Sequence, residues 1–275
     1  MQMTAGADAL GRARVALGAV FLLRTTPLLA AFHIPFLADT MPLLGWPDGH
    51  AHFTPFIPAL PDALLAALCI ARTLAAVAFT IGVRARVAGL LAGGLGYVTV
   101  LQDPARFFTT HHVIFLGTML LACTDAVSAC ALRPGTPRSP ASSAWLIRAW
   151  VASIYVWAAI AKLRPDWFDG RTFALLAREG QFRPFVASTL LATDTRRCVI
   201  AWCVVATELA LAPLLLIPRT RRAGLVLAIA FHLGLEWAAS PDLFGWAMIA
   251  LLLAFLDLKE PSSGHSAGTS GRKAP

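Results

Sequence analysis

The sequence predicts an all-α integral membrane protein with about eight transmembrane helices and short amphipathic cap segments outside the membrane. Three observations support this fold class: the composition, the length of the apolar runs and the charge of the loops. Hydrophobic residues make up 57% of the 275 residues and charged residues only 14%, with a mean hydropathy of +0.68. Ordinary soluble domains carry roughly 25% charged residues.

Apolar runs of about 17–25 residues, the length that crosses a bilayer, recur along the chain. The eight runs lie at about 14–32, 62–82, 86–102, 111–132, 144–162, 198–217, 222–240 and 243–258. Each is expected to be helical, because backbone groups in lipid must be hydrogen-bonded within their own segment. Residues 12–258 are therefore predicted to form one transmembrane domain. The small, polar segments 1–11 and 259–275 are expected to be disordered.

Positive charge alternates from one loop to the next. Cations gather at the N-terminus, at 84–86, at 133–138, at 219–222 and in the C-terminal tail, whereas 33–61 and 239–243 have none. This pattern follows the positive-inside rule with both termini cytoplasmic in the cell membrane. The net charge of +8 is then explained by topology and anionic lipid, and no nucleic-acid partner is expected.

Two segments on the predicted external side are long enough to have structure of their own. Residues 33–61 are rich in proline and aromatic residues, and residues 164–197 mix Phe and Leu with Arg. The second pattern suits short amphipathic helices lying on the membrane surface. Together the two segments could form a cap over the outer mouth of the bundle.

Lys162 ends the apolar run 144–162 and is chemically unusual in this chain. The sequence has 20 Arg but only three Lys, and Lys259 and Lys273 lie in the polar tail. An Arg stays protonated in proteins, whereas a desolvated Lys can lose its proton near neutral pH. Lys162 is therefore a candidate base. The alternative is that Lys162 only anchors a helix end at the membrane surface.

Further polar residues lie within or beside the predicted spans. Glu208 is in the middle of 198–217, and His232 and Glu236 share one face of 222–240. Charged residues at membrane depth usually mark a site or a structural ion pair. The structural alternative is that Glu208 pairs with one of the cations Arg24, Arg72 and Arg148. No spacing of His, Cys or acidic residues suggests a metal site.

One stretch, Tyr155 to Gly170, resembles the most recognisable motif of the HTTM (horizontally transferred transmembrane) domain, which includes the membrane part of vitamin K-dependent gamma-carboxylase. The resemblance is carried by Tyr155, Lys162, Trp167 and Gly170 at the motif's spacing. Weaker matches extend it over about residues 12–258: Arg14-x-x-x-Gly18, His112 to Gly117, Asp125 to Ser128, Glu208 before the turn at 218–221, Phe231-His232 and Phe244-Gly245-Trp246.

The resemblance implies a membrane enzyme that uses a reduced quinone of the vitamin K hydroquinone type. In the carboxylase, the Lys matching Lys162 deprotonates the quinol, oxygen converts it to an epoxide, and the strong base formed acts on a glutamate side chain so that CO2 can add. The resemblance assigns a catalytic role to Lys162 and His112. It places Tyr155, Trp167, His232 and Glu208 at the cofactor site, on the external face.

Two departures from the carboxylase limit what the resemblance implies. The carboxylase continues into a large extramembrane domain that holds its peptide substrate, so carboxylation here is expected to need a separate peptide or protein partner. Ala161 also stands where the carboxylase has a second Lys. The alternative function is a non-enzymatic quinone- or lipid-binding partner of a redox or export protein, in which Lys162 binds a headgroup.

Overall fold

A computed structural model describes residues 5–25, 60–101, 109–132, 140–239 and 243–256. In these ranges the regular elements are helices, joined by one isolated antiparallel bridge between Phe182 and Ala239. The long helices are α1 (Ala5–Thr25), α2 (Asp62–Ile81), α3 (Ala85–Leu101), α4 (Thr109–Ala122), α5 (Pro140–Ala161), α9 (Asp194–Leu216), α10 (Arg221–Ala238) and α11 (Phe244–Leu252). The short ones are η3 (Asp125–Val127), α6 (Pro165–Phe168), α7 (Arg171–Arg178), α8 (Pro184–Thr189) and η4 (Leu253–Phe255).

The helices agree in position with the eight predicted apolar runs, since each run overlaps one long helix. Within the described residues, three stretches are long and apolar enough to cross a membrane: Ala63–Ile81, Ala144–Ala161 and Asp194–Leu216. Ala85–Leu101, Thr109–Ala122 and Phe244–Phe255 are apolar but shorter. The all-helical membrane class is therefore confirmed, while the number of crossings stays a prediction.

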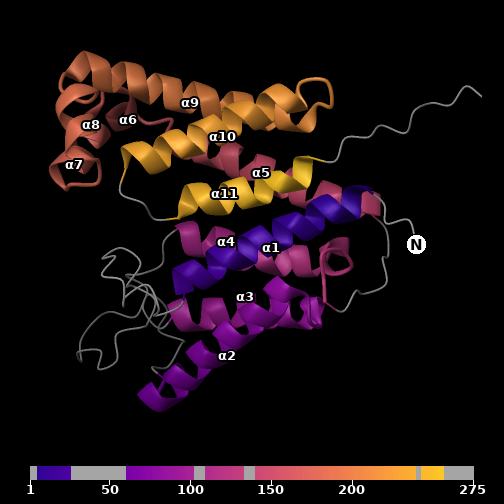
Figure 1. Ribbon diagram of the computed structural model, residues 1–275. Helices are drawn as coiled ribbons and strands as arrows, with labels where there is room; N and C mark the ends of the chain where they lie inside the picture. Colours follow the sequence, from indigo (N-terminus) through magenta and orange to yellow (C-terminus); the bar gives the residue numbers. More distant parts are fainter. Residues whose placement is uncertain (1–4, 26–59, 102–108, 133–139, 240–242, 257–275) are drawn as a thin grey trace, which may run out of the picture.

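The bundle is arranged around α1, which lies near its middle (Figure 1). Helices α2 and α3 lie on one side of α1, and α9 and α10 lie on the other, with α4, α5 and α11 between them. A continuous apolar core runs through these helices and includes Leu17, Phe79, Ile114, Tyr155 and Met248. The short helices α6–α8 cover one end of the bundle, beside the start of α9.

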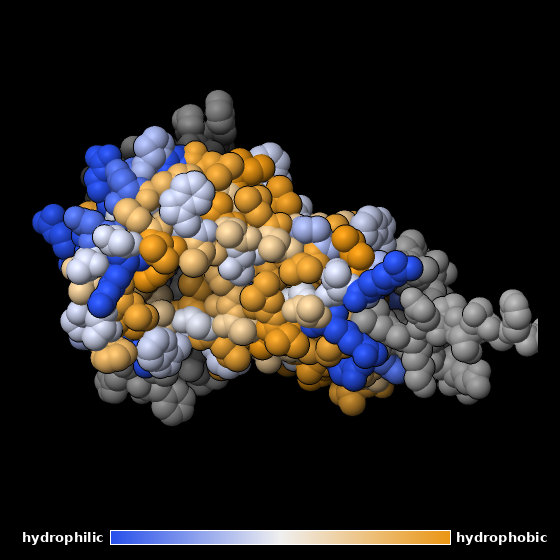
Figure 2. Space-filling model, turned by 90° about the horizontal axis from the view of Figure 1, so that it is seen from above, coloured by the Kyte–Doolittle hydropathy of each residue, from blue (hydrophilic) through white to orange (hydrophobic). Residues whose placement is uncertain are grey.

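The outer surface of α9 and α10 is apolar across its middle. Figure 2 shows an apolar band there, with hydrophilic residues gathered towards the two ends of the molecule. Several large apolar side chains of these two helices are exposed, including Val199, Trp202 and Leu209 of α9 and Val226 and Trp237 of α10. A soluble protein rarely exposes so continuous an apolar surface, whereas a membrane protein presents one to lipid.

Glycines let α3 approach its neighbours closely. A Cβ atom on Gly93 would lie 2.4 Å from the side chain of Met119, and one on Gly96 would lie 2.6 Å from the ring of Phe115. Both neighbours belong to α4, so the glycine-rich run brings α3 and α4 together, as small residues do in membrane bundles.

Arg14 fixes the end of the bundle opposite the cap. It is fully buried, and its guanidinium donates to five backbone carbonyls, those of Phe79, Thr80, Ala126, Ala129 and Cys130. One turn further along α1, a Cβ on Gly18 would overlap the Thr80 hydroxyl. The Arg14-x-x-x-Gly18 pattern therefore serves to join α1 to the end of α2 and to the segment around η3.

Two expectations about helix and disorder boundaries need correction, and a third concerns segments outside the described residues. Helix α1 begins at Ala5, and Leu10 is buried in the core, so the expected disorder of 1–11 is wrong for residues 5–11. The run 111–132 is not one helix, because α4 ends at Ala122 and Thr124 caps the short helix η3 instead. The expected structure of 33–59 and of the tail 259–275 lies outside the described residues.

Candidate active site in a cavity beneath the cap

Lys162 follows directly after the last residue of α5, where the chain must turn. Pro165 cannot continue the hydrogen-bond ladder of α5, and the residue before a proline disfavours helical dihedrals. Arg164 is accordingly extended, with φ −134° and ψ 149°, and Pro165 begins α6. The turn leaves the Lys162 side chain beside the last turn of α5, where its Nζ donates to the Ala158 carbonyl oxygen at 3.1 Å.

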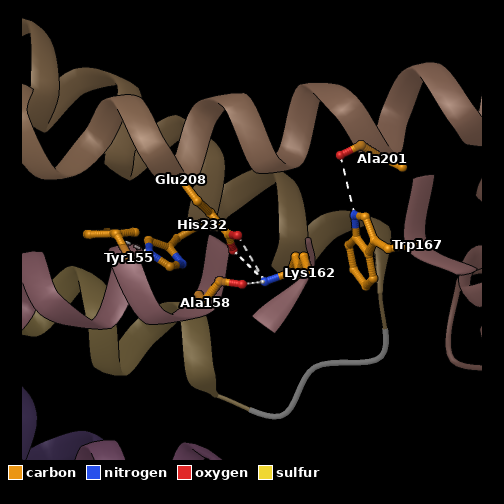
Figure 3. A network of polar contacts seen from close by, with 7 residues as sticks. All are labelled: Tyr155, Ala158, Lys162, Trp167, Ala201, Glu208 and His232. Atoms are coloured by element: carbon orange, nitrogen blue, oxygen red, sulfur yellow. Dashed lines mark hydrogen bonds and ion pairs between the residues drawn. The ribbon is translucent and has the colours of Figure 1, made fainter. Parts of the chain in front are cut away.

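The Lys162 ammonium is paired with Glu208 of α9. Its Nζ lies 2.8 Å from Oε1 and 2.9 Å from Oε2 of the carboxylate (Figure 3). The Glu208 side chain is only 8% exposed, and that of Lys162 is 21% exposed. An ammonium has three hydrogens, so the two carboxylate oxygens and the Ala158 carbonyl provide one acceptor for each.

Trp167 stands on the other side of the ammonium. The Lys162 Nζ lies 5.3 Å from the centre of its ring, within the range of a cation–π contact. The indole Nε1 donates to the Ala201 carbonyl oxygen of α9 at 3.4 Å, which holds the ring against that helix. Figure 3 shows the Lys162 amino group between Glu208 and Trp167.

Gly170 explains the last position of the Tyr155–Gly170 motif. Its φ of +78° favours glycine, and a Cβ there would lie 2.6 Å from the Cβ of Arg197 on α9. The cap then folds back over the bundle: Phe173, Val186, Leu191 and Ala201 form a small core of their own. The Arg183 N–H donates to the Ala238 carbonyl oxygen, which joins the cap to the end of α10.

A cavity of about 780 Å³ lies beneath the cap. Its polar lining includes Lys162, Glu208, His112 and Ser153, and much of the remaining wall is aromatic: Trp150, Trp157, Trp167, Phe173, Phe182, Phe231 and Phe244. Helices α4, α5, α9, α10 and α11 and the cap each contribute to it. Ligand sites typically combine such an apolar wall with a few polar groups.

A second polar pair lies behind the cavity wall. The Tyr155 hydroxyl and His232 Nε2 are 2.8 Å apart, and both residues are almost fully buried. The His232 ring contacts Phe231 and Phe244, which line the cavity. In Figure 3 the pair lies along α5 from Lys162, on the side away from Trp167.

The structure brings most of the predicted site residues together. Lys162, Glu208, His112 and Trp167 line one cavity, and Tyr155 and His232 lie directly behind its wall. The structural alternative predicted that Glu208 pairs with an arginine. Within the described residues the ion pair of Glu208 is with Lys162 instead. Two of the candidate arginines bond elsewhere, Arg72 to Thr99 and the Thr25 carbonyl, and Arg148 to the Ala254 carbonyl.

Sequence reasoning missed Tyr97 of α3, whose hydroxyl lies 2.7 Å from Nδ1 of His112. A usable signal was present, because the chain has only two Tyr residues and both lie in apolar runs. A phenol at membrane depth needs a hydrogen-bond partner, and both partners are histidines. As for metals, the described residues contain no cluster of three or more His, Cys, Asp or Glu that could hold an ion.

Comparison with known proteins identifies the family. The model of the HTTM domain matches residues 6–259, nearly the whole chain. No curated protein and no solved structure gives a significant match. The matched range contains the Lys162–Glu208 pair and every helix that lines the cavity. The chain therefore belongs to the HTTM family of membrane proteins, whose domain is also found in vitamin K-dependent gamma-carboxylase.

Proposed function

We propose that this protein is an enzyme that binds a reduced quinone in the cavity beneath the cap and removes a proton from it with Lys162. The observation that carries the proposal is the position of the Lys162–Glu208 ion pair within an otherwise largely apolar, aromatic wall. Its volume of about 780 Å³ suits a drug-sized aromatic ligand. Trp167, Trp157 and Phe244 would hold a flat ring, and the ion pair would meet its polar edge.

Lys162 becomes a base only when its proton has another place to go. Glu208 is the nearest acceptor, since both of its oxygens already contact Nζ. Transfer of one proton from Nζ to the carboxylate converts two charges into two neutral groups, which an apolar surrounding favours relative to water. Nζ then holds a lone pair that accepts a proton from a ligand hydroxyl. A reduced quinone supplies such a hydroxyl together with two reducing electrons.

The test compares wild type with Lys162→Arg. Arginine keeps a cation that Glu208 can bind through two parallel hydrogen bonds, but it does not give up its proton. Both proteins are incubated in nanodiscs with reduced menaquinone and oxygen, and quinone epoxide is measured by LC–MS. We expect epoxide from wild type and at least about a 100-fold lower rate from the variant, the lower end of what a general base contributes.

Binding is measured separately, so that loss of chemistry and loss of ligand are distinguished. Trp150, Trp157 and Trp167 line the cavity, so oxidised menaquinone bound there should quench tryptophan fluorescence. Quenching of both proteins, with epoxide from wild type alone, supports the base. An equal epoxide rate in Lys162→Arg rules out Lys162 as the base. Absence of quenching in wild type rules out a quinone site.

The second candidate function is a non-enzymatic quinone- or lipid-binding partner of another membrane protein. It is favoured by one observation: all three hydrogens of the Lys162 ammonium have protein acceptors, which suits a fixed charge. In that case wild type and Lys162→Arg both quench and neither forms epoxide. A peptide or protein substrate supplied by a separate chain is compatible only with the enzymatic function, because such a substrate would react with the strong base formed when the quinol is converted to the epoxide.

We also propose eight membrane crossings, with both termini cytoplasmic and the cap external. The support is the alternation of loop charge and the agreement of the long helices with the predicted runs. In a variant whose five cysteines are replaced by alanine, Arg178→Cys in the cap should react with an impermeant thiol reagent on intact cells. Ser263→Cys in the tail should react only after permeabilisation. Reaction of both from outside would contradict this topology.

A further inference from the structure

Tyr97 is a residue without an assigned role that touches the cavity machinery through His112. Its hydroxyl is 2.7 Å from Nδ1 of His112, and its ring meets that imidazole edge to face, with centres 5.9 Å apart. His112 itself lines the cavity that holds Lys162 and Glu208. Tyr97 is not among the residues that line the cavity, so any effect of Tyr97 on a ligand in the cavity acts through His112.

The position of Tyr97 is set by close helix packing rather than by chance contact. Gly93 and Gly96 of α3 leave no room for a Cβ against Met119 and Phe115 of α4. The Tyr97 ring packs edge to face on Phe115, with centres 5.6 Å apart. The phenol is therefore held at a fixed place one turn from the start of α4, opposite the His112 ring.

We propose that Tyr97 is a positioning residue that holds His112 in one tautomer, with the ring hydrogen on Nε2, so that the imidazole donates to an oxygen atom of the cavity ligand. The 2.7 Å contact admits two arrangements: the phenol donates to Nδ1, or Nδ1–H donates to the phenol oxygen and the phenol hydrogen is left with the His112 carbonyl oxygen at 3.5 Å. A distance of 3.5 Å is beyond the usual range of an O–H···O hydrogen bond, so the first arrangement makes better use of the phenol hydrogen. When Nδ1 accepts, a neutral imidazole carries its hydrogen on Nε2.

The ligand that this arrangement favours is one with an acceptor oxygen at its edge. His112 of α4 and the Lys162–Glu208 pair of α5 and α9 line one aromatic-walled cavity. A quinone, oxidised or reduced, has oxygens on opposite sides of a flat ring, which suits polar groups contributed by different helices. The identity of the ligand rests on the proposed function, whereas the tautomer does not.

The tautomer is tested by ¹⁵N NMR of histidine-labelled protein in nanodiscs at a pH of about 8.5, where an ordinary imidazole is neutral. The His112→Gln variant identifies the His112 signals among the seven histidines. We expect wild type to show hydrogen on Nε2, and Tyr97→Phe to show a mixture of both tautomers. Phenylalanine keeps the ring contacts with His112 and Phe115, so only the hydroxyl is removed.

Tyr155→Phe is the matched control, because it removes the other phenol–imidazole bond of the chain, at His232. It should change the His232 signals and leave those of His112 unchanged. Hydrogen on Nδ1 of His112 in wild type would overturn the proposal. So would a His112 spectrum that is identical in wild type and Tyr97→Phe.

Ligand binding is tested by a double-mutant cycle with oxidised menaquinone and tryptophan quenching. Loss of one net hydrogen bond should raise Kd about two- to tenfold in His112→Phe, which has no donor, with a smaller rise in Tyr97→Phe. In the His112→Phe background Tyr97→Phe should add nothing, because the tyrosine acts through the histidine. Additive effects would contradict this indirect role. Absence of menaquinone binding in wild type would refute the proposed function, and the NMR result would still decide the tautomer.

Discussion

Arg14 and Lys162 are both cations held inside the helix bundle, and their surroundings differ in kind. Arg14 is fully buried, and its described acceptors are five backbone carbonyls from the end of α2 and the segment around η3. Lys162 keeps a partly exposed side chain, lines a cavity, and has a carboxylate as its main partner. Arg14 is therefore bound by fixed carbonyl dipoles, whereas Lys162 is bound by a carboxylate that can itself accept a proton.

Under the proposed function, this difference separates a structural charge, Arg14, from a chemical one, Lys162. A guanidinium stays protonated, and backbone carbonyls do not accept its proton, so nothing at Arg14 can change except by unfolding. Between Lys162 and Glu208 one proton can move along an existing hydrogen bond. The proposed chemical role of Lys162 agrees with the presence of a single Lys in the membrane part of the sequence, residues 12–258.

Exchange of the two cations should give the largest effect. Lysine at position 14 has three hydrogens for five carbonyls, so Arg14→Lys removes the arginine hydrogen bond from at least two of them, at a cost of up to about 6 kcal/mol. We expect strong loss of folded protein, measured by fluorescence-detected size exclusion after heating. Lys162→Arg, which can still bind Glu208, is the matched exchange and should change stability much less. Equal losses would show that the two sites do not differ as described.

Removal of the Glu208 charge should give the next largest effect. Glu208→Gln leaves the Lys162 ammonium without a counter-charge in an apolar wall. Removal of one partner of a fully buried pair costs about 3–5 kcal/mol in the free energy of unfolding, and we expect a loss below that range because the Lys162 side chain is 21% exposed. The double variant Lys162→Met/Glu208→Gln should regain part of that loss. Glu179→Gln in the exposed cap is the control and should be neutral. Strictly additive effects in the cycle would mean that the pair is not coupled.

A smaller effect is expected from the glycine that sets the turn after Lys162. Gly170→Ala adds a Cβ 2.6 Å from the Arg197 Cβ, and Gly180→Ala meets no heavy atom within 4 Å, although both glycines have positive φ. The two variants share the backbone strain, so their difference reports the overlap, about 1–3 kcal/mol. Thermal unfolding measures it. If Gly180→Ala were as damaging, the close approach to α9 would not be what requires glycine.

The smallest effect is expected at Asp169, at the exposed end of the same turn. Its carboxylate accepts from the Arg171 backbone N–H at 3.0 Å and from the Arg171 side chain, which lowers the pKa of Asp169 below its usual 3.8. Its support of α7 is therefore present above pH 3.8 and is lost as the pH falls through the lowered value. Hydrogen exchange of residues 171–178, corrected for intrinsic rates, should be flat between pH 8 and 5 in wild type. A decline within that range would contradict the lowered pKa.

The positions of the long helices could be predicted from sequence because a bilayer leaves the backbone few alternatives. Helix ends were less predictable: α1 begins at Ala5, since even a weakly apolar segment becomes helical when Leu10 can pack into the core. Helix α4 ends before the apolar run 111–132 does. The Thr124 and Ser128 side chains form hydrogen bonds with local backbone groups around η3, and these bonds compete with a continued helix.

The residues of the candidate site could be predicted from the sequence, but the contacts between them could not. Lys162 was distinguished by its rarity, but its partner Glu208 is 46 residues away, and the sequence does not reveal how α5 faces α9. An arginine partner was equally consistent with the sequence, because the bonds of Arg72 to Thr99 and of Arg148 to Ala254 depend on tertiary packing. The Tyr97–His112 contact depends on the α3–α4 packing in the same way.

The order of the ion pair along the chain has a consequence for biosynthesis. At about 5–20 residues per second, the ribosome adds the 46 residues from Leu163 to Glu208 in roughly 2–9 s. If the helices enter the membrane in chain order, α5 enters with a cation whose carboxylate partner has not yet been synthesised. Lys162 lies at the end of α5, where a long side chain can still reach water, whereas Glu208 lies within α9 and enters lipid when its counter-ion is already present. Lys162, which is synthesised first, therefore lies where an unpaired charge has the lower free-energy cost.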